Sequence, residues 1–474
     1  MRGKDLLEKL ELADEKYIQA ANMPVKKKKT RKFFKAAAII LAVGGISLLI
    51  HTNYTNINIS TGENFSKYSS LNELLAYLGE NENHENELMG TKSLSANVSG
   101  VDTGSVMYNE YRYRFGRHDG NRTYYEFLQI FNLKEGKLVN TVELEPFHDY
   151  PTIFVYQNKL ILAGGNSQTA VNIYSLDNPE NPVLEHRYIQ NGAFDTAFIS
   201  DDKLYIFTSD GMCACGFSSK SNPDDYKPSA TLDEKEIEWT DDEITIIGEP
   251  ERVFYNAVSV MDLNNTEILQ KRAFYGDIQD MYIDKDIIMF HTQSSFDYYD
   301  KPKIDTFDMS DNFSHISQIT INALSVTRIH DIKKIGTSYK IIAQTYYQTG
   351  FSLTRGYLGT SEIVAISADI QTGNYYSKKY IFDYIPTNAD NFVREIIWNE
   401  NTATLSVERR GLYIDNTTYG LSVTFNDNSI SFEKTEPPQT QTQTNYLIGR
   451  SQTFEYDGKK FYIDYQKNTL ETVP

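Results

Sequence analysis

Two cysteines are the first residues in this sequence whose type and spacing could do chemistry. Cys213 and Cys215 are separated by one residue, a spacing that fits a redox pair, a metal-binding fragment or a tight disulfide. They are the only cysteines of the chain, and no histidine lies near them in the sequence, which argues against a metal site. The spacing therefore favours two loop thiols or a structural bond.

Three His-Asp dipeptides form a second group of candidates. They are His118-Asp119, His148-Asp149 and His330-Asp331. A histidine beside a carboxylate suggests a general base and the group that orients it. Adjacent residues of a strand point to opposite faces of a sheet, which argues against a direct dyad. We interpret the three pairs as surface turns at or near strand ends.

The third group is an acidic segment, residues 222–251. Its carboxylates are Asp224, Asp225, Asp233, Glu234, Glu236, Glu238, Asp241, Asp242 and Glu243. Carboxylates at this density could bind Ca²⁺ loosely or bind a basic partner. The simplest alternative, which we favour, is a solvated and partly disordered loop. Trp239 in the middle of the segment is a candidate anchor for a protein partner.

The sequence lacks the motifs of several enzyme classes. It contains no HExxH, GxSxG, P-loop, CxxC or DxDxDG pattern. Its 2 tryptophans, Trp239 and Trp398, are too few for a quinoprotein whose blades are stapled by that residue. We therefore assign no catalytic residue and no cofactor, leave metal binding open, and predict that the protein is not an enzyme.

The net charge of −18 over 474 residues combines two opposite regions. Residues 1–35 carry eleven Lys/Arg and five Asp/Glu, so residues 51–474 carry −24. An acidic body repels phosphate backbones, which excludes nucleic acid as a partner of the large region. The short basic stretch lies beside an apolar segment, a placement typical of a membrane surface.

Residues 36–50 form that apolar segment, AAAIILAVGGISLLI, without a charge or a proline. With Phe33, Phe34 and Lys35 it would form a helix of roughly 27 Å, and we predict a transmembrane helix over 33–51. A cleaved signal peptide is the alternative, but about 35 residues precede the segment and no A-x-A-like site follows it. The basic flank predicts a cytoplasmic N-terminus and an extracellular main domain.

Residues 5–21, DLLEKLELADEKYIQAA, are predicted to form a short amphipathic helix. Its apolar stripe includes Leu6, Leu10 and Tyr17. Such a helix could lie on the membrane, fray, or dock on a cytoplasmic partner. With the lysine cluster and the single span, this N-terminus resembles many single-pass proteins of Firmicutes, some of them similar to anti-sigma factors. The resemblance implies a cytoplasmic sigma factor as a partner.

The remaining chain divides into a linker and a large domain. Ser70 and Glu73 have the spacing of a capping box before LNELLAYL, which predicts a helix over 71–78. Residues 79–96 are polar. The predicted organisation is a cytoplasmic tail (1–32), the span (33–51), a helix with a polar linker (52–99), and an extracellular domain (100–474) with an acidic insert at about 211–255.

One strand pattern recurs through the large domain. Its copies are LQIFNL ending at Leu133, VNIYSL at Leu176, VSVMDL at Leu263, IDTFDM at Met309 and IVAISA at Ala368. A turn and a further strand follow each copy, so three to four strands occupy about 40–45 residues. This is the period of a β-propeller blade. The sequence predicts an all-β propeller of six to eight blades, closed by strands near 106–115 and the tail hairpin 454–463 in a shared blade.

Residues 170–210 and 256–265 carry a more specific resemblance. A "hYDhSDPENPxhh" turn is followed by an "hxDxLYLhT" hairpin, and the matching residues are Tyr174, Leu176, Asp177, Pro179, Asn181, Pro182, Asp202, Leu204, Tyr205 and Thr208. These segments are similar to the bacterial secreted C-terminal β-propeller family, and the resemblance implies that fold over about 100–470. Many members have a "GVDEADhVKTDGxYIY" segment, of which this chain retains only Gly100-Val101-Asp102.

Together these patterns favour a membrane-anchored extracellular propeller that binds a ligand, either a glycan or a protein, without enzymatic activity. It could also act as a sensor coupled to cytoplasmic regulation. The alternative is a cell-surface, glycan-active enzyme with paired carboxylates in the propeller channel.

Overall fold

The structure is a computed structural model that describes most of the chain after residue 55. The described ranges are 56–60, 66–80, 96–97, 105–119, 124–145, 151–212, 222–248, 250, 253–284, 286–293, 302–322, 327–352, 356–369, 374–382, 389–411, 414–437, 453–456, 459–464 and 469–472. Within these ranges no helix is both long and apolar enough to cross a membrane. The predicted tail (1–32) and the predicted span (33–51) lie outside them.

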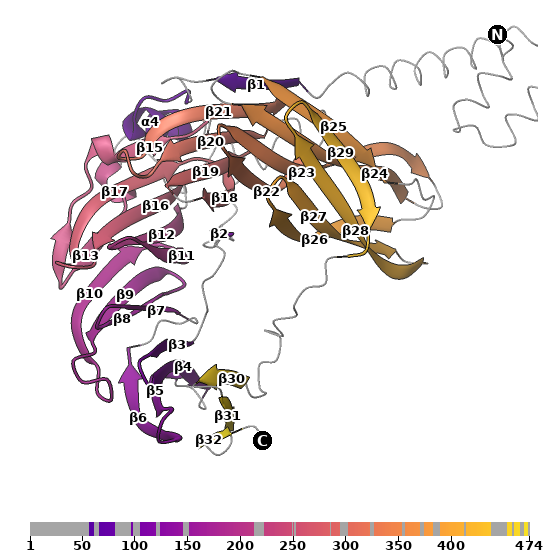
Figure 1. Cartoon of the computed structure of the whole chain (residues 1–474). Coiled ribbons are helices and arrows are strands. Elements are labelled where there is room, and N and C mark those ends of the chain that lie inside the picture. Colours follow the sequence, from indigo (N-terminus) through magenta and orange to yellow (C-terminus); the bar gives the residue numbers. More distant parts are fainter. Residues whose placement is uncertain are drawn as a thin grey trace, which may run out of the picture. The chain divides into compact units, whose positions relative to one another are not determined.

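Six antiparallel sheets of four main strands follow one another along the chain (Figure 1). The first sheet contains β3 (Ser105–Tyr108), β4 (Tyr111–Asp119), β5 (Tyr124–Asn132) and β6 (Lys137–Leu144). The second contains β7 (Thr152–Tyr156), β8 (Lys159–Gly164), β9 (Gln168–Ser175) and β10 (Val183–Asn191). The third contains β11 (Ala193–Ser200), β12 (Lys203–Met212), β16 (Val253–Asp262) and β17 (Glu267–Tyr275).

The last three sheets repeat this meander. The fourth contains β18 (Ile278–Asp284), β19 (Ile287–Thr292), β20 (Lys303–Asp308) and β21 (Ser314–Asn322). The fifth contains β22 (Thr327–Ile335), β23 (Ser338–Ser352), β24 (Gly356–Asp369) and β25 (Tyr375–Ile381). The sixth contains β26 (Ala389–Asn399), β27 (Thr402–Gly411), β28 (Ile414–Asn426) and β29 (Ser429–Thr435). The all-β prediction is confirmed.

The five copies of the sequence pattern all occupy the same place in their sheets. They fall on β5, β9, β16, β20 and β24, each the third main strand. In four of the five copies, the backbone N–H of the last residue donates to a carbonyl in the turn between the first two strands. These bonds run from Leu133 to Glu110 (2.8 Å), Leu176 to Asn158 (2.7 Å), Leu263 to Asp202 (2.8 Å) and Met309 to Asp286 (2.7 Å).

The prediction that strands near 106–115 share a sheet with the tail is wrong. β3 and β4 pair with each other and with β5 in the first sheet. The tail forms a separate three-stranded sheet of β30 (Thr453–Tyr456), β31 (Lys459–Asp464) and β32 (Thr469–Thr472). Short local turns close both sets of strands, and local pairing costs less loop entropy than joining the two ends of the domain.

Consecutive sheets from the first to the sixth share buried hydrophobic clusters. Phe207 and Val258 of the third sheet belong to one cluster with Phe290 and Phe307 of the fourth. Equivalent clusters join the other neighbouring pairs of sheets. Because a sheet packs on both faces, its middle strands are buried throughout, as in β19. This explains why those strands are apolar runs rather than strict alternations.

Neighbouring sheets are also joined through the turn that precedes the fourth strand. The Tyr113 hydroxyl of the first sheet donates to the Pro179 carbonyl (2.9 Å), and the Asn140 amide donates to the Glu180 carbonyl (2.7 Å), both in the NPENP turn of the second sheet. Arg272 of the third sheet likewise donates to the Asn312 carbonyl of the fourth (3.1 Å). The proline-containing turn recognised in the sequence therefore fixes the stacking of two sheets.

The predicted helix over 71–78 is confirmed as α4 (Leu71–Glu80). The Ser70 hydroxyl accepts from the backbone N–H of Glu73 (3.2 Å), and the Glu73 carboxylate accepts from the backbone N–H of Ser69 (2.8 Å). These bonds satisfy orphan donors at the start of the helix. Short strands flank α4: β1 (Asn56–Ser60) lies beside β21, and β2 (Ala96–Asn97) pairs in parallel with β18.

Candidate functional site

A repeated irregularity in the first strand of four sheets gives the best candidate site. The pairing of β11, β18, β22 and β26 with their second strands skips one residue. The skipped residues are Asp195, Gln279, His330 and Arg394. We call these four residues the bulge row. A β-bulge re-aims one side chain and leaves it outside the ladder, which is why bulges are frequent next to binding sites.

Each residue of the bulge row is held by the residue fourteen positions later, which lies on the second strand or, for Gln279, directly after it. The Gln279 amide donates to the Gln293 carbonyl (2.9 Å), and His330 Nε2 lies 2.9 Å from Gln344 Oε1. Arg394 Nε donates to Glu408 Oε2 (2.6 Å). The repeated spacing places four different polar groups in one backbone environment.

Asp195 has the most elaborate setting of the four. Its carboxylate accepts from Ser209 Oγ of β12 (2.9 Å) and from Asn256 Nδ2 of β16 (3.2 Å). Both donors are neutral and almost fully buried. They fix the direction of the carboxylate without cancelling its charge.

The bulge row offers a carboxylate, an amide, an imidazole and a guanidinium. These groups can accept and donate hydrogen bonds and can pair with charges of either sign. The Arg394 side chain is exposed, and its guanidinium carbon lies 5.5 Å from the centre of the Phe392 ring. Each side chain of the bulge row is chemically suited to contact a polar ligand. The described residues contain no group of three or more His, Cys, Asp or Glu side chains that could hold a metal ion.

Of the three His-Asp pairs, only His330-Asp331 has described side chains. The two side chains diverge: His330 meets Gln344, while Asp331 accepts from Trp398 Nε1 of the sixth sheet (2.9 Å). Burial raises the pKa of the Asp331 carboxyl. The prediction that the pair is not a dyad is confirmed, but its placement in a surface turn is wrong, because it lies within β22, where the paired sheet partly buries it.

Over the described residues 222–248, which we call the strap, the prediction of a partly disordered loop is wrong. The predicted solvation is confirmed, because all the acidic side chains in this range except Glu243 are exposed. The strap contains η1 (Pro223–Tyr226), β13 (Ala230–Leu232), β14 (Lys235–Ile237), η2 (Asp241–Glu243) and β15 (Ile244–Ile246). β13 extends the second sheet beside β10, and β15 pairs in parallel with β17 of the third. The strap therefore ties together the outer edges of two sheets.

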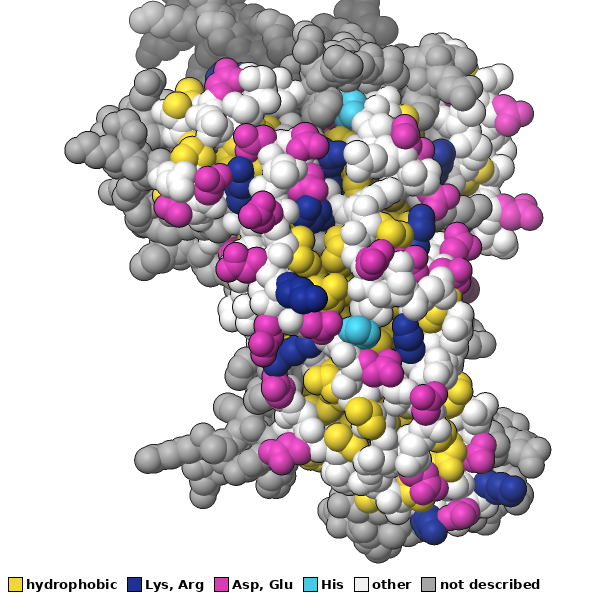
Figure 2. Space-filling view, turned by 90° about the vertical axis from the view of Figure 1, so that its left-hand side faces the viewer, with side chains coloured by type: hydrophobic (Ala, Val, Ile, Leu, Met, Phe, Trp, Pro, Cys, Tyr) yellow, Lys and Arg dark blue, Asp and Glu magenta, His cyan; other side chains and the backbone are white. Residues whose placement is uncertain are grey.

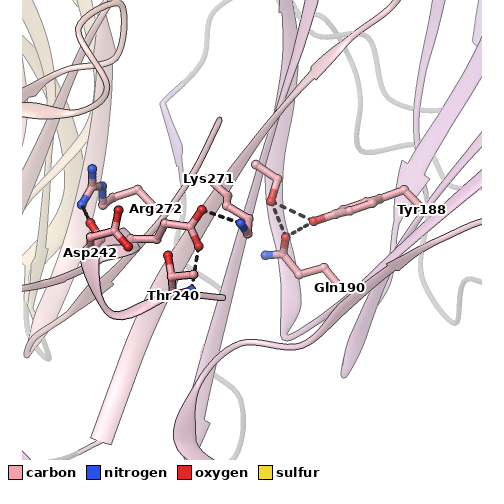
Figure 3. Close-up of polar contacts among 8 residues, drawn as sticks. Tyr188, Gln190, Thr240, Asp242, Lys271 and Arg272 are labelled. Carbon is pink, nitrogen blue, oxygen red and sulfur yellow. Dashed lines mark hydrogen bonds and ion pairs between the residues drawn. The ribbon is translucent and has the colours of Figure 1, made fainter. Parts of the chain in front are cut away.

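Two lysines pair with three of the strap's nine carboxylates, and the pair made by Lys271 is drawn in Figure 3. Lys227 Nζ lies 2.8 Å from a carboxylate oxygen of Asp224 and 2.8 Å from one of Asp241. Lys271 of β17 pairs with the Glu243 carboxylate, and Arg272 donates to the Asp242 carbonyl. The loop prediction failed because Lys271 and Arg272 lie far from these acids in the sequence.

A buried polar network lies beside the strap in the same view (Figure 3). The Tyr188 hydroxyl donates to Ser259 Oγ (2.8 Å), which donates to Gln190 Oε1 (2.7 Å). Gln190 Nε2 also donates to Thr208 Oγ1. Burial raises the pKa of the Tyr188 phenol, so the hydroxyl stays protonated and serves as a fixed donor between the second and third sheets.

Of the residues predicted to bind partners, the structure describes only Trp239. Trp239 lies in a buried cluster with Leu71, Leu74 and Leu75 of α4 and is 6% exposed. In this structure its indole ring is covered by the chain's own helix, and an outside partner stays a prediction. Leu6, Leu10 and Tyr17 lie outside the described residues, as do Cys213 and Cys215.

The sequence contained a signal for the bulge row that we did not use. Asp195, His330 and Arg394 each lie six residues before a turn residue with a left-handed backbone, namely Asp201 (φ 51°), Gly336 (φ 61°) and Glu400 (φ 49°). Gln279 keeps the same spacing to Lys285. In the second sheet the equivalent position, six residues before Gln157 (φ 51°), is Pro151, which has no polar side chain.

Comparison with known proteins bears on the fold. Residues 126–346 match the family model of the beta propeller domain. This match supports a β-propeller domain across the second, third and fourth sheets and parts of the first and fifth. No curated protein matches the chain.

Several solved structures resemble the chain weakly. Hydrazine synthase of Kuenenia stuttgartiensis matches with a TM-score of 0.32 and 10% identity over 74% of this chain and 92% of that one. Hsv2p of Kluyveromyces lactis gives 0.31 and 11% over 73% and 100%. The beta-propeller domain of a Trilobed protease from Pyrococcus furiosus gives 0.28 and 10% over 57% and 76%. At these scores and identities the likenesses do not assign an activity.

Proposed function

We propose that the chain is a membrane-anchored, extracellular binding module without enzymatic activity, and that its β-propeller domain holds a polar ligand at the bulge row. Each of the six sheets and the tail sheet would be one blade. The match to the beta propeller domain model supports the fold on which this proposal depends.

The chemistry of the bulge row carries the proposal. Where the repeats serve packing alone they keep one kind of residue, as at Leu133, Leu176 and Leu263. The four bulge positions share one backbone geometry and carry four different hydrogen-bonding groups. Side chains that differ on a constant backbone suit recognition, because each contact with a ligand has its own chemistry.

The proposed location follows from the sequence of the N-terminal region. The apolar residues 36–50 would anchor the chain, and the basic residues before them would keep the N-terminus in the cytoplasm. The bulge row would then meet ligands outside the cell, which would be glycans or proteins of the envelope. On the face drawn in Figure 2, basic and acidic side chains are interspersed, so this face offers no single-sign field to a charged partner.

Binding to a panel of soluble bacterial wall polysaccharides and purified envelope proteins tests the proposal with the full chain in detergent. Asp195→Asn and Arg394→Gln should weaken binding about tenfold or more, since each removes a charged group that contacts the ligand. Arg187→Gln is the matched control, because Arg187 also pairs with a glutamate, Glu145, but on the outer strand β10. Equal affinity in all three variants would refute the bulge row as the site.

The same incubation distinguishes a binding protein from an enzyme. A binding module should leave the polysaccharides at their original length. Shortened products would instead support the alternative, a glycan-active enzyme with carboxylates in the propeller channel.

We also propose that the cytoplasmic tail docks on a sigma factor through Leu6, Leu10 and Tyr17, which makes the protein a sensor. A full chain tagged at its N-terminus and crosslinked in its host should capture that factor. Leu6→Asp with Leu10→Asp should abolish the capture, because charges interrupt the apolar stripe. Capture that survives both substitutions, or envelope partners alone, would rule out this role.

A further inference from the structure

Helix α4 and Asp195 of the bulge row approach β12 and β16 of the third sheet from different sides. α4 packs on the strap, and its residues Leu71, Leu74 and Leu75 share a buried cluster with Tyr255 of β16. Asp195 accepts hydrogen bonds from Ser209 of β12 and Asn256 of β16. Two features far apart in the sequence thus depend on one pair of strands.

Asp195 and α4 contact adjacent residue pairs of the β12–β16 ladder, and we call each such residue pair a rung. Ser209 faces Asn256 across the ladder, and the next rung pairs Asp210 with Tyr255. Successive residues of a strand point to opposite faces, so the first rung serves Asp195 and the second serves the cluster with α4. The second rung is itself bonded, because the Tyr255 hydroxyl donates to Asp210 Oδ2 (3.4 Å).

Tyr255 connects the second rung to the strap. Its ring lies 5.3 Å from the Tyr275 ring, centroid to centroid. The Tyr275 hydroxyl donates to the Tyr226 carbonyl in η1 (2.6 Å), and η1 is the strap element next to α4. A change at the first rung therefore reaches α4 through shared backbone and two contacting rings.

We infer that the state of the Asp195 carboxylate and the docking of α4 are coupled through these two rungs. A ligand that draws the carboxylate away from Ser209 and Asn256 shifts the rung, disturbs Tyr255 and loosens α4. α4 is an element with two states, docked and undocked, because a helix of ten residues has little stability without its buried face. The inference extends the proposed function by giving the bound ligand a readout at the N-terminal side of the propeller domain.

Hydrogen exchange of the α4 backbone in the purified full chain tests this coupling without any ligand. Asp195→Asn keeps the shape of the side chain but removes the charged acceptor, and it should speed exchange in α4 about fivefold, the effect of losing about one hydrogen bond. Leu74→Ala, which empties a fully buried position of the helix face, is the positive control for undocking. Arg394→Gln, at the same position in the sixth sheet, is the matched control and should leave α4 unchanged.

A double-mutant cycle shows whether the effect passes through Tyr255. Tyr255→Leu removes the ring that contacts Tyr275, and in that background Asp195→Asn should alter exchange in α4 less than it does in the native background. Unchanged exchange in Asp195→Asn, alongside faster exchange in Leu74→Ala, would overturn the coupling. Hydrogen exchange in β19 and β20 reports global unfolding. If Asp195→Asn speeds exchange in these strands as well, exchange of α4 is measured in Asp195→Glu instead.

The outcome is independent of the binding experiment. If α4 does not respond while Asp195→Asn still weakens polysaccharide or protein binding, the coupling fails and the proposed function stands.

Discussion

The Asp305 carboxyl has no exposed surface, and it lies on β20 between the third and fourth sheets. One oxygen accepts from Gln318 Nε2 (2.8 Å) and lies 3.5 Å from His315 Nε2, and the other has no hydrogen-bond partner among the described residues. Burial raises the pKa of this carboxyl in spite of these neighbours. The folded protein therefore holds this carboxyl in a position that disfavours its charged form.

Asp305→Asn should stabilise the protein at pH 7 by about 1–3 kcal/mol, the scale of a buried, poorly satisfied polar group. Because the folded pKa lies above the unfolded one, the native carboxyl costs stability in full above its folded pKa. This cost declines as the pH falls from the folded pKa to the unfolded pKa. The advantage of the variant should therefore shrink towards pH 4. Urea unfolding at both pH values measures it, with Asp308→Asn on the same strand as a control that gains nothing.

Tyr113 supports the first two sheets through a single hydroxyl. Tyr113→Phe should cost about 1 kcal/mol, because the Pro179 carbonyl loses its donor at a part-buried site. Tyr111→Phe is the comparison, since the Tyr111 hydroxyl donates to Glu180 at an exposed site (3.1 Å) and water can replace it. Thermal unfolding should separate the two variants, and equal loss in both would contradict the role given to the buried turn.

At the scale of the element, the turn that joins the first two strands of a sheet repeatedly contains a residue with a left-handed backbone conformation. In the fifth sheet this residue is Gly336, and a Cβ added there would meet no atom within 4 Å. Gly336→Ala should therefore destabilise the protein by about 1 kcal/mol through the backbone alone. Gly336→Asn should cost less, because asparagine tolerates this conformation. Denaturant midpoints of the two variants check the order.

The strands could be predicted because their periodicity is local. The hydrophobic residues of LQIFNL and VNIYSL fix the third strand of a sheet, and Ser70 with Glu73 fixes the start of α4. A sixth copy, in β28, has the same alternation at Leu421, Val423 and Phe425.

The strap and the bulge row could not be derived in the same way. The order of the strap depends on Lys271 and Arg272, which lie at least 28 residues from their partners along the chain. The bulge row depends on the register of each strand pair, and one skipped residue leaves no mark in the hydrophobic pattern. Only comparison of the repeats at a common turn reveals Asp195, His330 and Arg394 as equivalent.

At the scale of the whole molecule, the two cysteines offer a test of orientation. Cys213 and Cys215 are the only thiols of the chain, and both fall in the proposed extracellular domain. After mild reduction, a membrane-impermeant maleimide should label them on intact cells as fully as in lysed cells. Labelling that requires lysis would place this domain inside and reverse the proposed orientation. Cys213→Ser with Cys215→Ser controls for labelling of other proteins.

The contacts made through the turns before the fourth strand share a direction. Tyr113 and Asn140 hold the Pro179–Glu180 turn of the following sheet, and Arg272 holds the Asn312 turn. The donors thus lie on the sheet that is synthesised first. A sheet that has just emerged finds its docking partner already folded, so assembly can proceed in the order of synthesis without waiting for the C-terminus. This order limits how long each newly made strand edge stays uncovered.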